Sequence, residues 1–313
     1  MGVDMSVHIG PAILKNPVIA ASGCYNRGAE YARVTEIGEY GAITIKSITS
    51  KPRLGNSMPR VIPVPGGLLN AIGLQGPGID HFLAHDAREI AAVPTAIIAS
   101  VAGFSVAEFA AVAVRMNGLP NVIAIELDVS CPNVDREGEC FAESAAAIGE
   151  VVRAVKATAK LPVIAKLTPN VSDLRSIAVA AEAAGADAIS LINAVRGMVI
   201  DTTRARPWLA NGTGGLTGPA IRPIAVLAVW EVARAVRIPI IGMGGIETAR
   251  DALEFMFAGA TAVSVGTANF RDPDVARKIN AGLRGEAARR GFASVSALTG
   301  LANPEFAGVR VSR

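Results

Sequence analysis

The sequence contains little cysteine, little histidine and few aromatic residues. Among its 313 residues there are three cysteines and three histidines, and aromatic residues make up 4%. Cys24, Cys131 and Cys140 show no C-x-x-C spacing. This pattern argues against a disulfide framework, a zinc ribbon or an iron–sulfur cluster held by this chain alone. The sequence also has no H-x-H motif and no acidic cluster, so we expect no metal site.

An excess of charge of one sign and a long apolar run are also missing. The formal net charge is +3, and no block of Lys and Arg is interleaved with aromatic residues. This argues against nucleic acid as a partner. The first 17 residues lack the positively charged and apolar regions of a signal peptide, and no segment has 18 uninterrupted apolar residues. We therefore expect the 51% hydrophobic content to form a buried core in a cytoplasmic protein with no membrane segment.

What the sequence does contain is a regular alternation of short β-rich runs and Ala-rich helical stretches, such as residues 144–159 and 174–186. The expected strands are residues 17–22, 42–47, 95–101, 122–130, 162–168, 187–193, 238–244 and 262–268. Eight such units predict an α/β protein with a (β/α)8 barrel, and a doubly wound sheet is the main rival. Without a linker or a further repeat, residues 1–313 are expected to form one domain.

Polar residues end most of the expected strands, and in a barrel these ends meet on the C-terminal face, where active sites are built. His8, His81 and His85 lie at none of these ends, which disfavours a histidine-based mechanism. Two long segments rich in Pro and Gly, residues 51–75 and 204–222, lack helical periodicity. Loops of this length in a compact domain are usually lids or binding loops.

Glycines follow the last two expected strands, at Gly244-Gly245 and at Gly266, which precedes Thr267. Backbone N–H groups at such positions can form a phosphate cradle, as barrels do after strands seven and eight. A Gly-Gly pair can also be a tight turn. Because both loops carry glycine, we favour phosphate binding.

The fourth strand runs into Cys131, which Pro132 follows. A cysteine can be a small buried hydrophobic residue, but a proline after it ends the strand and favours exposure of the thiol at the rim. A thiolate there could act as a general base if a neighbouring group lowers its pKa.

Lysines and asparagines supply further candidate groups. Lys46 and Lys166 end two strands, where each could extend to solvent or neutralise an anionic substrate or cofactor. Asn70, Asn133 and Asn193 suit a planar polar heterocycle, although any one could be a turn residue.

Taken together, these motifs resemble the dihydroorotate dehydrogenases, flavin-dependent barrels of pyrimidine biosynthesis. The matching segments are SCPN at 130–133, IKS at 45–47, NAIGLQ at 70–75, AKL at 165–167 and residues 240–260, in the family's order over nearly the whole chain. Cysteine in SCPN resembles the soluble class 1 enzymes. NAIGLQ is most similar to the NAD-linked class 1B catalytic subunit.

The resemblance implies a bound FMN and a set of residues around it. Cofactor contacts are implied for Ser22, Lys46, Ser47, Ser100, Asp128, Lys166, Ile192, Gly218, Gly244, Gly245, Gly266 and Thr267. Substrate contacts are implied for Lys46, Asn70, Ala71, Ile72, Gly73, Leu74, Asp128, Asn133, Asn193 and Ala194. Lys46 and Cys131 would be the catalytic residues, and Cys131 would remove the C5 proton of dihydroorotate while hydride passes from C6 to the flavin.

The resemblance also implies a homodimeric core and a partner subunit that carries FAD and a [2Fe–2S] cluster and passes electrons to NAD⁺. Three positions depart from the family's usual residues: Asp128 and Ser100 stand where it has Asn, and Ala194 where it has Thr. An ionised Asp128 would repel the carboxylate of orotate. The alternative hypothesis is therefore a related FMN barrel that acts on another dihydropyrimidine or cyclic substrate.

Overall fold

Eight parallel strands form a closed barrel, which confirms the predicted (β/α)8 fold. The computed structural model describes residues 2–31, 34–129 and 141–309. Around the barrel the strands follow the order β10-β15-β16-β3-β4-β7-β8-β9. Their bounds are Val18–Ala20 (β3), Ala42–Thr44 (β4), Ala96–Val101 (β7), Val122–Leu127 (β8), Val163–Lys166 (β9), Ala188–Leu191 (β10), Ile240–Met243 (β15) and Ala262–Val265 (β16). All eight lie within the predicted ranges.

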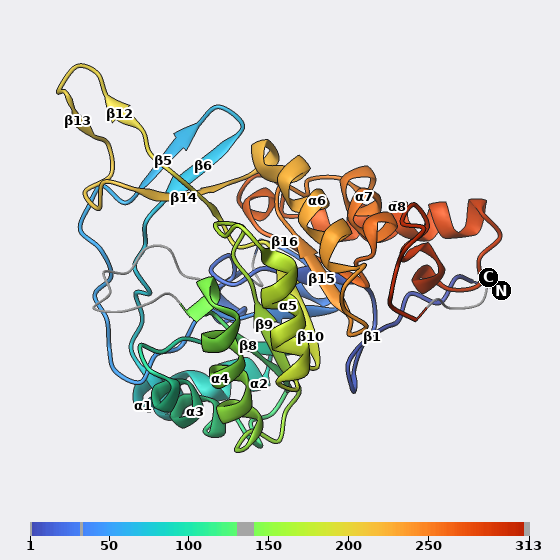
Figure 1. Ribbon diagram of the computed structural model, residues 1–313, viewed down its shortest axis with the longest axis horizontal. Coiled ribbons are helices and arrows are strands. Elements are labelled where there is room, and N and C mark those ends of the chain that lie inside the picture. The colour runs from blue at the N-terminus through green and yellow to red at the C-terminus, as the bar shows by residue number, and fades with distance from the viewer. Residues whose placement is uncertain (1, 32–33, 130–140, 310–313) are drawn as a thin grey trace.

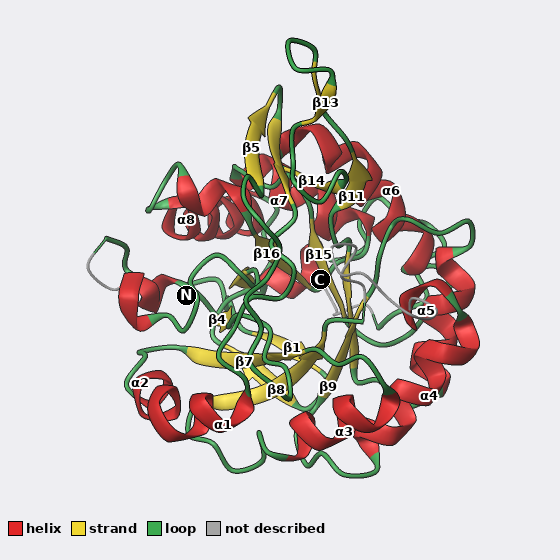
Figure 2. Cartoon of the chain, turned by 90° about the vertical axis from the view of Figure 1, so that its left-hand side faces the viewer, coloured by secondary structure: helices red, strands yellow, loops and turns green. Residues whose placement is uncertain are grey.

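Helices surround the barrel (Figure 2). Their bounds are Ile79–His81 (α1), Ala87–Ala91 (α2), Val106–Val114 (α3), Ala145–Lys156 (α4), Leu174–Ala183 (α5), Arg222–Val232 (α6), Ala249–Ala258 (α7) and Val275–Arg289 (α8). Several begin at a residue whose side chain accepts a hydrogen bond from a backbone N–H of the first turn: Ser105, Ser144, Asp173 and Thr248. Such caps satisfy N–H groups that have no partner inside the helix.

Short helical turns complete these connections. A π-helical turn, η3 (Phe82–Asp86), joins α1 to α2. The remaining turns are 3₁₀ helices: Ala29–Tyr31 (η1), Ile37–Glu39 (η2), Phe141–Glu143 (η4), Pro219–Ile221 (η5), Thr267–Phe270 (η6) and Val295–Leu298 (η7).

The barrel strands are buried on both faces, which explains their nearly continuous apolar sequences. Every residue of β9, β10, β15 and β16 is buried. Alternate side chains point toward the helices and into the barrel, because successive residues of a strand face opposite sides. The few polar residues in these strands therefore lie inside the barrel or at its ends.

The two long segments, which were expected to be lids or binding loops without helical periodicity, contain short strands that pair with each other. The strands β5 (Val61–Val64), β6 (Gly67–Asn70), β14 (Gly214–Thr217) and β11 (Val195–Gly197) form a four-stranded antiparallel sheet. We call it the loop sheet. In Figure 1 it lies at one end of the barrel, and the hairpin of β12 (Ile200–Asp201) and β13 (Arg206–Pro207) extends beyond it.

A second small sheet joins β1 (Val7–Ile9) to β2 (Ala12–Leu14) near the N-terminus. Val7, Ile9 and Leu14 are buried in the main core, so this hairpin packs onto the barrel. Within the described residues, no helix combines the length and the apolar composition needed to cross a membrane.

Candidate active site

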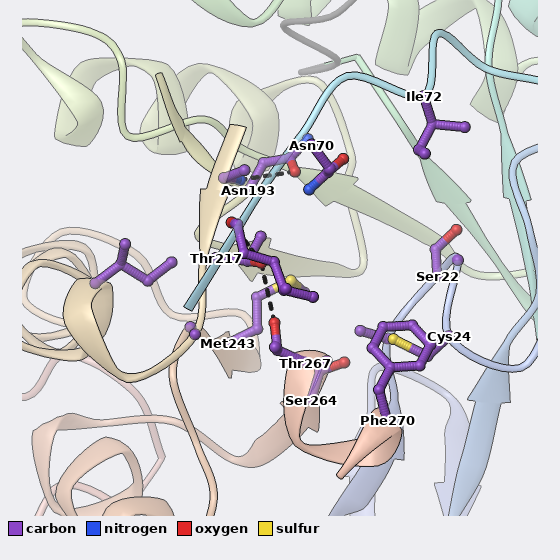
Figure 3. Close-up of a pocket in the computed structure, with 18 of the residues that line it drawn as sticks. Ser22, Cys24, Asn70, Ile72, Asn193, Thr217, Met243, Ser264, Thr267 and Phe270 are labelled. Atoms are coloured by element: carbon purple, nitrogen blue, oxygen red, sulfur yellow. Dashed lines mark hydrogen bonds between the residues drawn. The ribbon is translucent and has the colours of Figure 1, made fainter. Parts of the chain in front are cut away.

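A cavity of about 590 Å³ opens where the C-terminal ends of the barrel strands meet the loop sheet. Small-molecule sites usually occupy cavities of about 300–1,000 Å³. Most of the residues that sequence and resemblance indicated line it: Ser22, Lys46, Ser47, Asn70, Ile72, Gly73, Leu74, Asp128, Lys166, Ile192, Asn193, Ala194, Gly218, Gly244, Gly245, Gly266 and Thr267. Figure 3 views this cavity with Ser22, Asn70, Asn193 and Thr267 among the labelled side chains.

Four of the indicated residues are not among those lining the cavity. Ser100 is fully buried behind the residues that line the cavity, where its hydroxyl lies 2.9 Å from that of Ser47. Ala71 is fully buried in a small apolar cluster of the loop sheet. Cys131 and Asn133 lie outside the described residues.

One side of the cavity, which we call the glycine wall, consists of Gly218, Gly244, Gly245, Gly266 and Thr267. Gly245 has a φ of +72°, and a Cβ there would lie 2.7 Å from the Gly218 carbonyl oxygen. A Cβ on Gly266 would meet its nearest atom, the Ala21 Cβ, at 3.8 Å, an ordinary contact distance, and Gly266 lines the cavity. Thr267 donates a hydrogen bond of 3.0 Å to Thr217 (Figure 3). The glycine wall thus presents backbone and hydroxyl groups that suit a phosphate.

The other side, the charged wall, consists of Lys46, Ser47, Asp128 and Lys166. Ser47 Oγ donates to Asp128 Oδ2 at 2.8 Å. Because this bond uses the only hydroxyl proton of Ser47, Ser100 donates to Ser47 in turn. Ser100 and Asp128, two of the residues that depart from the family's usual ones, are therefore connected by hydrogen bonds through Ser47.

The second carboxylate oxygen of Asp128 lacks a hydrogen-bond donor among the described residues. Oδ1 is buried and has no hydrogen-bond partner within the described part of the chain. Asp128 is 7% exposed and lines the cavity. A buried carboxylate oxygen accepts hydrogen bonds and costs free energy when it has none. The charged wall therefore presents an acceptor where an asparagine could present an N–H donor.

Glu126 is a buried acidic residue that the sequence analysis missed. It lies in β8 two residues before Asp128, so both side chains point to the same side of the strand. Ser190 Oγ donates to Glu126 Oε2 at 2.8 Å, and Lys166 Nζ lies 4.0 Å from Oε1. Burial raises the pKa of Glu126, Lys166 lowers it, and Asp128 raises it. The sequence does contain a signal for Glu126, because it is the one charged residue in the otherwise apolar strand β8.

Cys24 also lines the cavity, but it is not suited to proton removal. Burial raises the pKa of its thiol to about 11. At neutral pH the thiol therefore stays protonated, whereas a general base must be in its proton-accepting form. Cys24 is therefore a poor candidate for a general base.

Two asparagine side chains line the cavity on the side of the loop sheet. Asn70, at the end of β6, donates from Nδ2 to the Gly215 carbonyl at 3.2 Å. Asn193 follows β10, and its Oδ1 accepts from the Ala194 N–H at 2.8 Å. Figure 3 places Asn70 and Asn193 close together on one side of the cavity. Both residues line the cavity, and their amides suit a planar polar ring.

The barrel and its cavity define a class of protein: a (β/α)8 barrel with a cavity at its C-terminal face whose lining suits a phosphorylated, planar, polar ligand. The comparison with known families is more specific. The family model described as dihydroorotate dehydrogenase matches residues 5–286. The chain belongs to the dihydroorotate dehydrogenase family.

Curated relatives cover almost the whole chain. The catalytic subunit of dihydroorotate dehydrogenase B (NAD(+)) from Desulforudis audaxviator is 48% identical over 97% of this chain and 99% of its own length. The protein of the same name from Trichlorobacter lovleyi is 48% identical over 95% and 97%. That from Geobacillus kaustophilus is 50% identical over 89% of each chain. This confirms the resemblance to the NAD-linked class 1B subunit.

Proposed function

We propose that this chain is the FMN-dependent catalytic subunit of a dihydroorotate dehydrogenase. It oxidises (S)-dihydroorotate to orotate in pyrimidine (UMP) biosynthesis, with NAD⁺ as the final electron acceptor. Support comes from the family match over residues 5–286 and from relatives named as catalytic subunits of the NAD(+)-linked enzyme. The observation in the structure that carries the proposal is the pairing of a glycine wall with a charged wall across one cavity.

The residues present fit FMN. The glycine wall offers backbone groups at Gly266 and a hydroxyl group at Thr267 for the phosphate, and the neighbouring Thr217 adds a second hydroxyl group. The charged wall offers Lys46 and Lys166 beside the space for the ring. When bound, FMN supplies the acceptor for the hydride that leaves C6 of dihydroorotate.

The protein's own residues bind the substrate and move its proton. Asn70, Asn193 and the segment from Ile72 to Leu74 line the cavity on the loop-sheet side, where they would hold the substrate ring. Lys46 would offset the negative charge of the substrate carboxylate. Cys131, three residues beyond Asp128, would take the C5 proton. The role of Cys131 rests on the family resemblance.

Replacement of Cys131 tests the catalytic assignment. We expect Cys131→Ala to retain FMN but to lose turnover at neutral pH by about 10²–10⁴-fold, the usual contribution of a general base. Cys140→Ala is the matched control and should retain turnover. Steady-state oxidation of dihydroorotate and flavin absorbance measure the two properties. Substantial turnover by Cys131→Ala would contradict the assigned base.

We further propose that residues 1–313 form one domain in a cytoplasmic homodimer, to which two partner subunits bind to form a heterotetramer. Each partner would carry FAD and a [2Fe–2S] cluster. The relatives' name, catalytic subunit, supports a partner of this kind. Co-expression with an adjacent FAD and iron–sulfur subunit should enable reduction of NAD⁺ by dihydroorotate. Reduction of NAD⁺ by the isolated chain would contradict this assembly.

A second candidate function follows from Asp128. Its Oδ1 atom has no hydrogen-bond donor among the described residues, and its negative charge disfavours an anionic substrate nearby. A related FMN barrel for an uncharged dihydropyrimidine or another cyclic substrate would suit this wall. The substitution Asp128→Asn distinguishes the two functions. A large gain in dihydroorotate oxidation would favour the second function, and a loss or no change would favour the first.

A further inference from the structure

Three polar side chains from neighbouring strands meet inside the barrel beneath the cavity. They are Glu126 of β8, Lys166 of β9 and Ser190 of β10. The side chains of Glu126 and Lys166 are only 4% and 9% exposed. Ser190 is the ladder partner of Lys166, and Ser100 of β7 is the ladder partner of Glu126. The pairing of four consecutive strands therefore determines the surroundings of Glu126.

A carboxyl group in this position is costly unless it has a compensating partner. Glu126 receives one hydrogen bond, from Ser190, and its other oxygen faces Lys166. Lys166 also lines the cavity, whereas Glu126 does not. Lys166 thus lies between the buried carboxyl group and the space for a ligand, and an effect of Glu126 on the ligand would pass through it.

The charges of the charged wall and of the carboxyl group behind it are balanced when all four groups are ionised. Lys46 and Lys166 carry two positive charges, and Glu126 and Asp128 carry two negative charges. A buried charge acts more strongly on its neighbours than one in water does, because the local dielectric constant is low. Removal of the Glu126 charge would leave the charge of Lys166 less compensated toward the cavity.

We propose that Glu126 is a positioning residue that holds Lys166 in place and offsets its charge, and thereby lowers the reduction potential of bound FMN. The inference rests on the proposed function, since it assigns the ligand beside Lys166 to FMN. Reduction adds electrons to the flavin, so a less compensated positive charge nearby favours the reduced form. Glu126 would therefore keep the flavin potential low enough to pass electrons onward.

The test is the midpoint potential of the purified holoenzyme, measured anaerobically at pH 8 in the wild type and in Glu126→Gln. Burial raises the pKa of this carboxyl, so an alkaline pH favours its ionised form. We expect Glu126→Gln to shift the equilibrium about tenfold toward reduced flavin. For a two-electron couple this is a rise of about 30 mV. Glu126→Asp keeps the charge and should shift the potential less. The exposed Glu89→Gln should leave it unchanged.

A double-variant cycle separates action through Lys166 from a direct effect. In the Lys166→Met background with FMN added to saturation, the further change Glu126→Gln should shift the potential by less than half of its effect in the wild type. An equal shift in both backgrounds would overturn the positioning role. So would an unchanged potential in Glu126→Gln that still binds FMN. A wild-type protein that binds no flavin would instead refute the proposed function.

Discussion

The two walls of the cavity are built on different physical principles. The glycine wall uses uncharged backbone and hydroxyl groups of the residues that follow β14, β15 and β16. The charged wall uses ionisable side chains of β9 and of the residues that follow β4 and β8. Two buried residues behind it, Ser100 and Glu126, contact the residues of this wall. The glycine wall thus depends on backbone conformation and on close approach of backbone segments, not on charge. The charged wall depends on contacts between strands that are distant in sequence.

The largest change is expected when the charge of Lys166 is removed, because this substitution disrupts the charged wall and leaves the glycine wall unchanged. Lys166→Met leaves the buried Glu126 without its opposite charge, which typically costs about 3 kcal/mol in the free energy of unfolding. Urea unfolding at saturating FMN measures this loss. The double variant Lys166→Met and Glu126→Gln should recover most of it. A double variant as unstable as the single one would contradict the pairing.

A smaller effect is expected in the glycine wall. Gly245→Ala places a Cβ at a φ of +72° and 2.7 Å from the Gly218 oxygen. Strain of this kind costs about 1–3 kcal/mol, and we expect weaker retention of FMN because the wall must shift. Equilibrium dialysis against FMN measures retention. Gly118→Ala is a matched control: its φ is +77°, but no atom lies near the added Cβ. Equal FMN retention in both variants would contradict a specific role for Gly245.

The smallest effect is expected from pH, because Lys166 opposes part of the effect of burial on Glu126. Burial raises the pKa of Glu126 in the folded chain above its value in the unfolded chain. The folded state therefore binds this proton more readily, and the stability from this group is present in acid and lost as pH rises through the folded-state pKa. Relative to Glu126→Gln, the wild type should lose stability in urea unfolding as the pH rises above 4.5, the ordinary pKa of this carboxyl group. A constant or opposite difference would show that the pKa is not raised.

The fold could be predicted from sequence because its signals are local. Each barrel strand is a short apolar run, and a strand buried on both faces has this pattern. The glycines at 244, 245 and 266 follow two such runs directly, so their place at the C-terminal face followed from the barrel alone. The loop sheet was missed because its strands are short and rich in glycine. Thr217 of β14 bonds to the carbonyl of Leu68 in β6, 149 residues away.

The charged wall could be predicted only in part, because its contacts also join residues that are distant in the sequence. The strand ends indicated Lys46 and Lys166, and the family pattern indicated Asp128. The contact of Asp128 with Ser47, and of Ser47 with Ser100, depends on how three strands are aligned, which the sequence does not state. Glu126 was overlooked because its strand was treated as one apolar run. Its importance depends on Lys166 and Ser190, which lie 40 and 64 residues further along the chain.

The most direct test of the account is an anaerobic titration of the purified protein with L-dihydroorotate, followed by the absorbance of oxidised flavin. The account predicts that the absorbance falls in proportion to the substrate added until the flavin is fully reduced. Such bleaching would establish cofactor and substrate together. A flavin that stays oxidised with dihydroorotate but is bleached by dithionite would contradict dihydroorotate as the substrate.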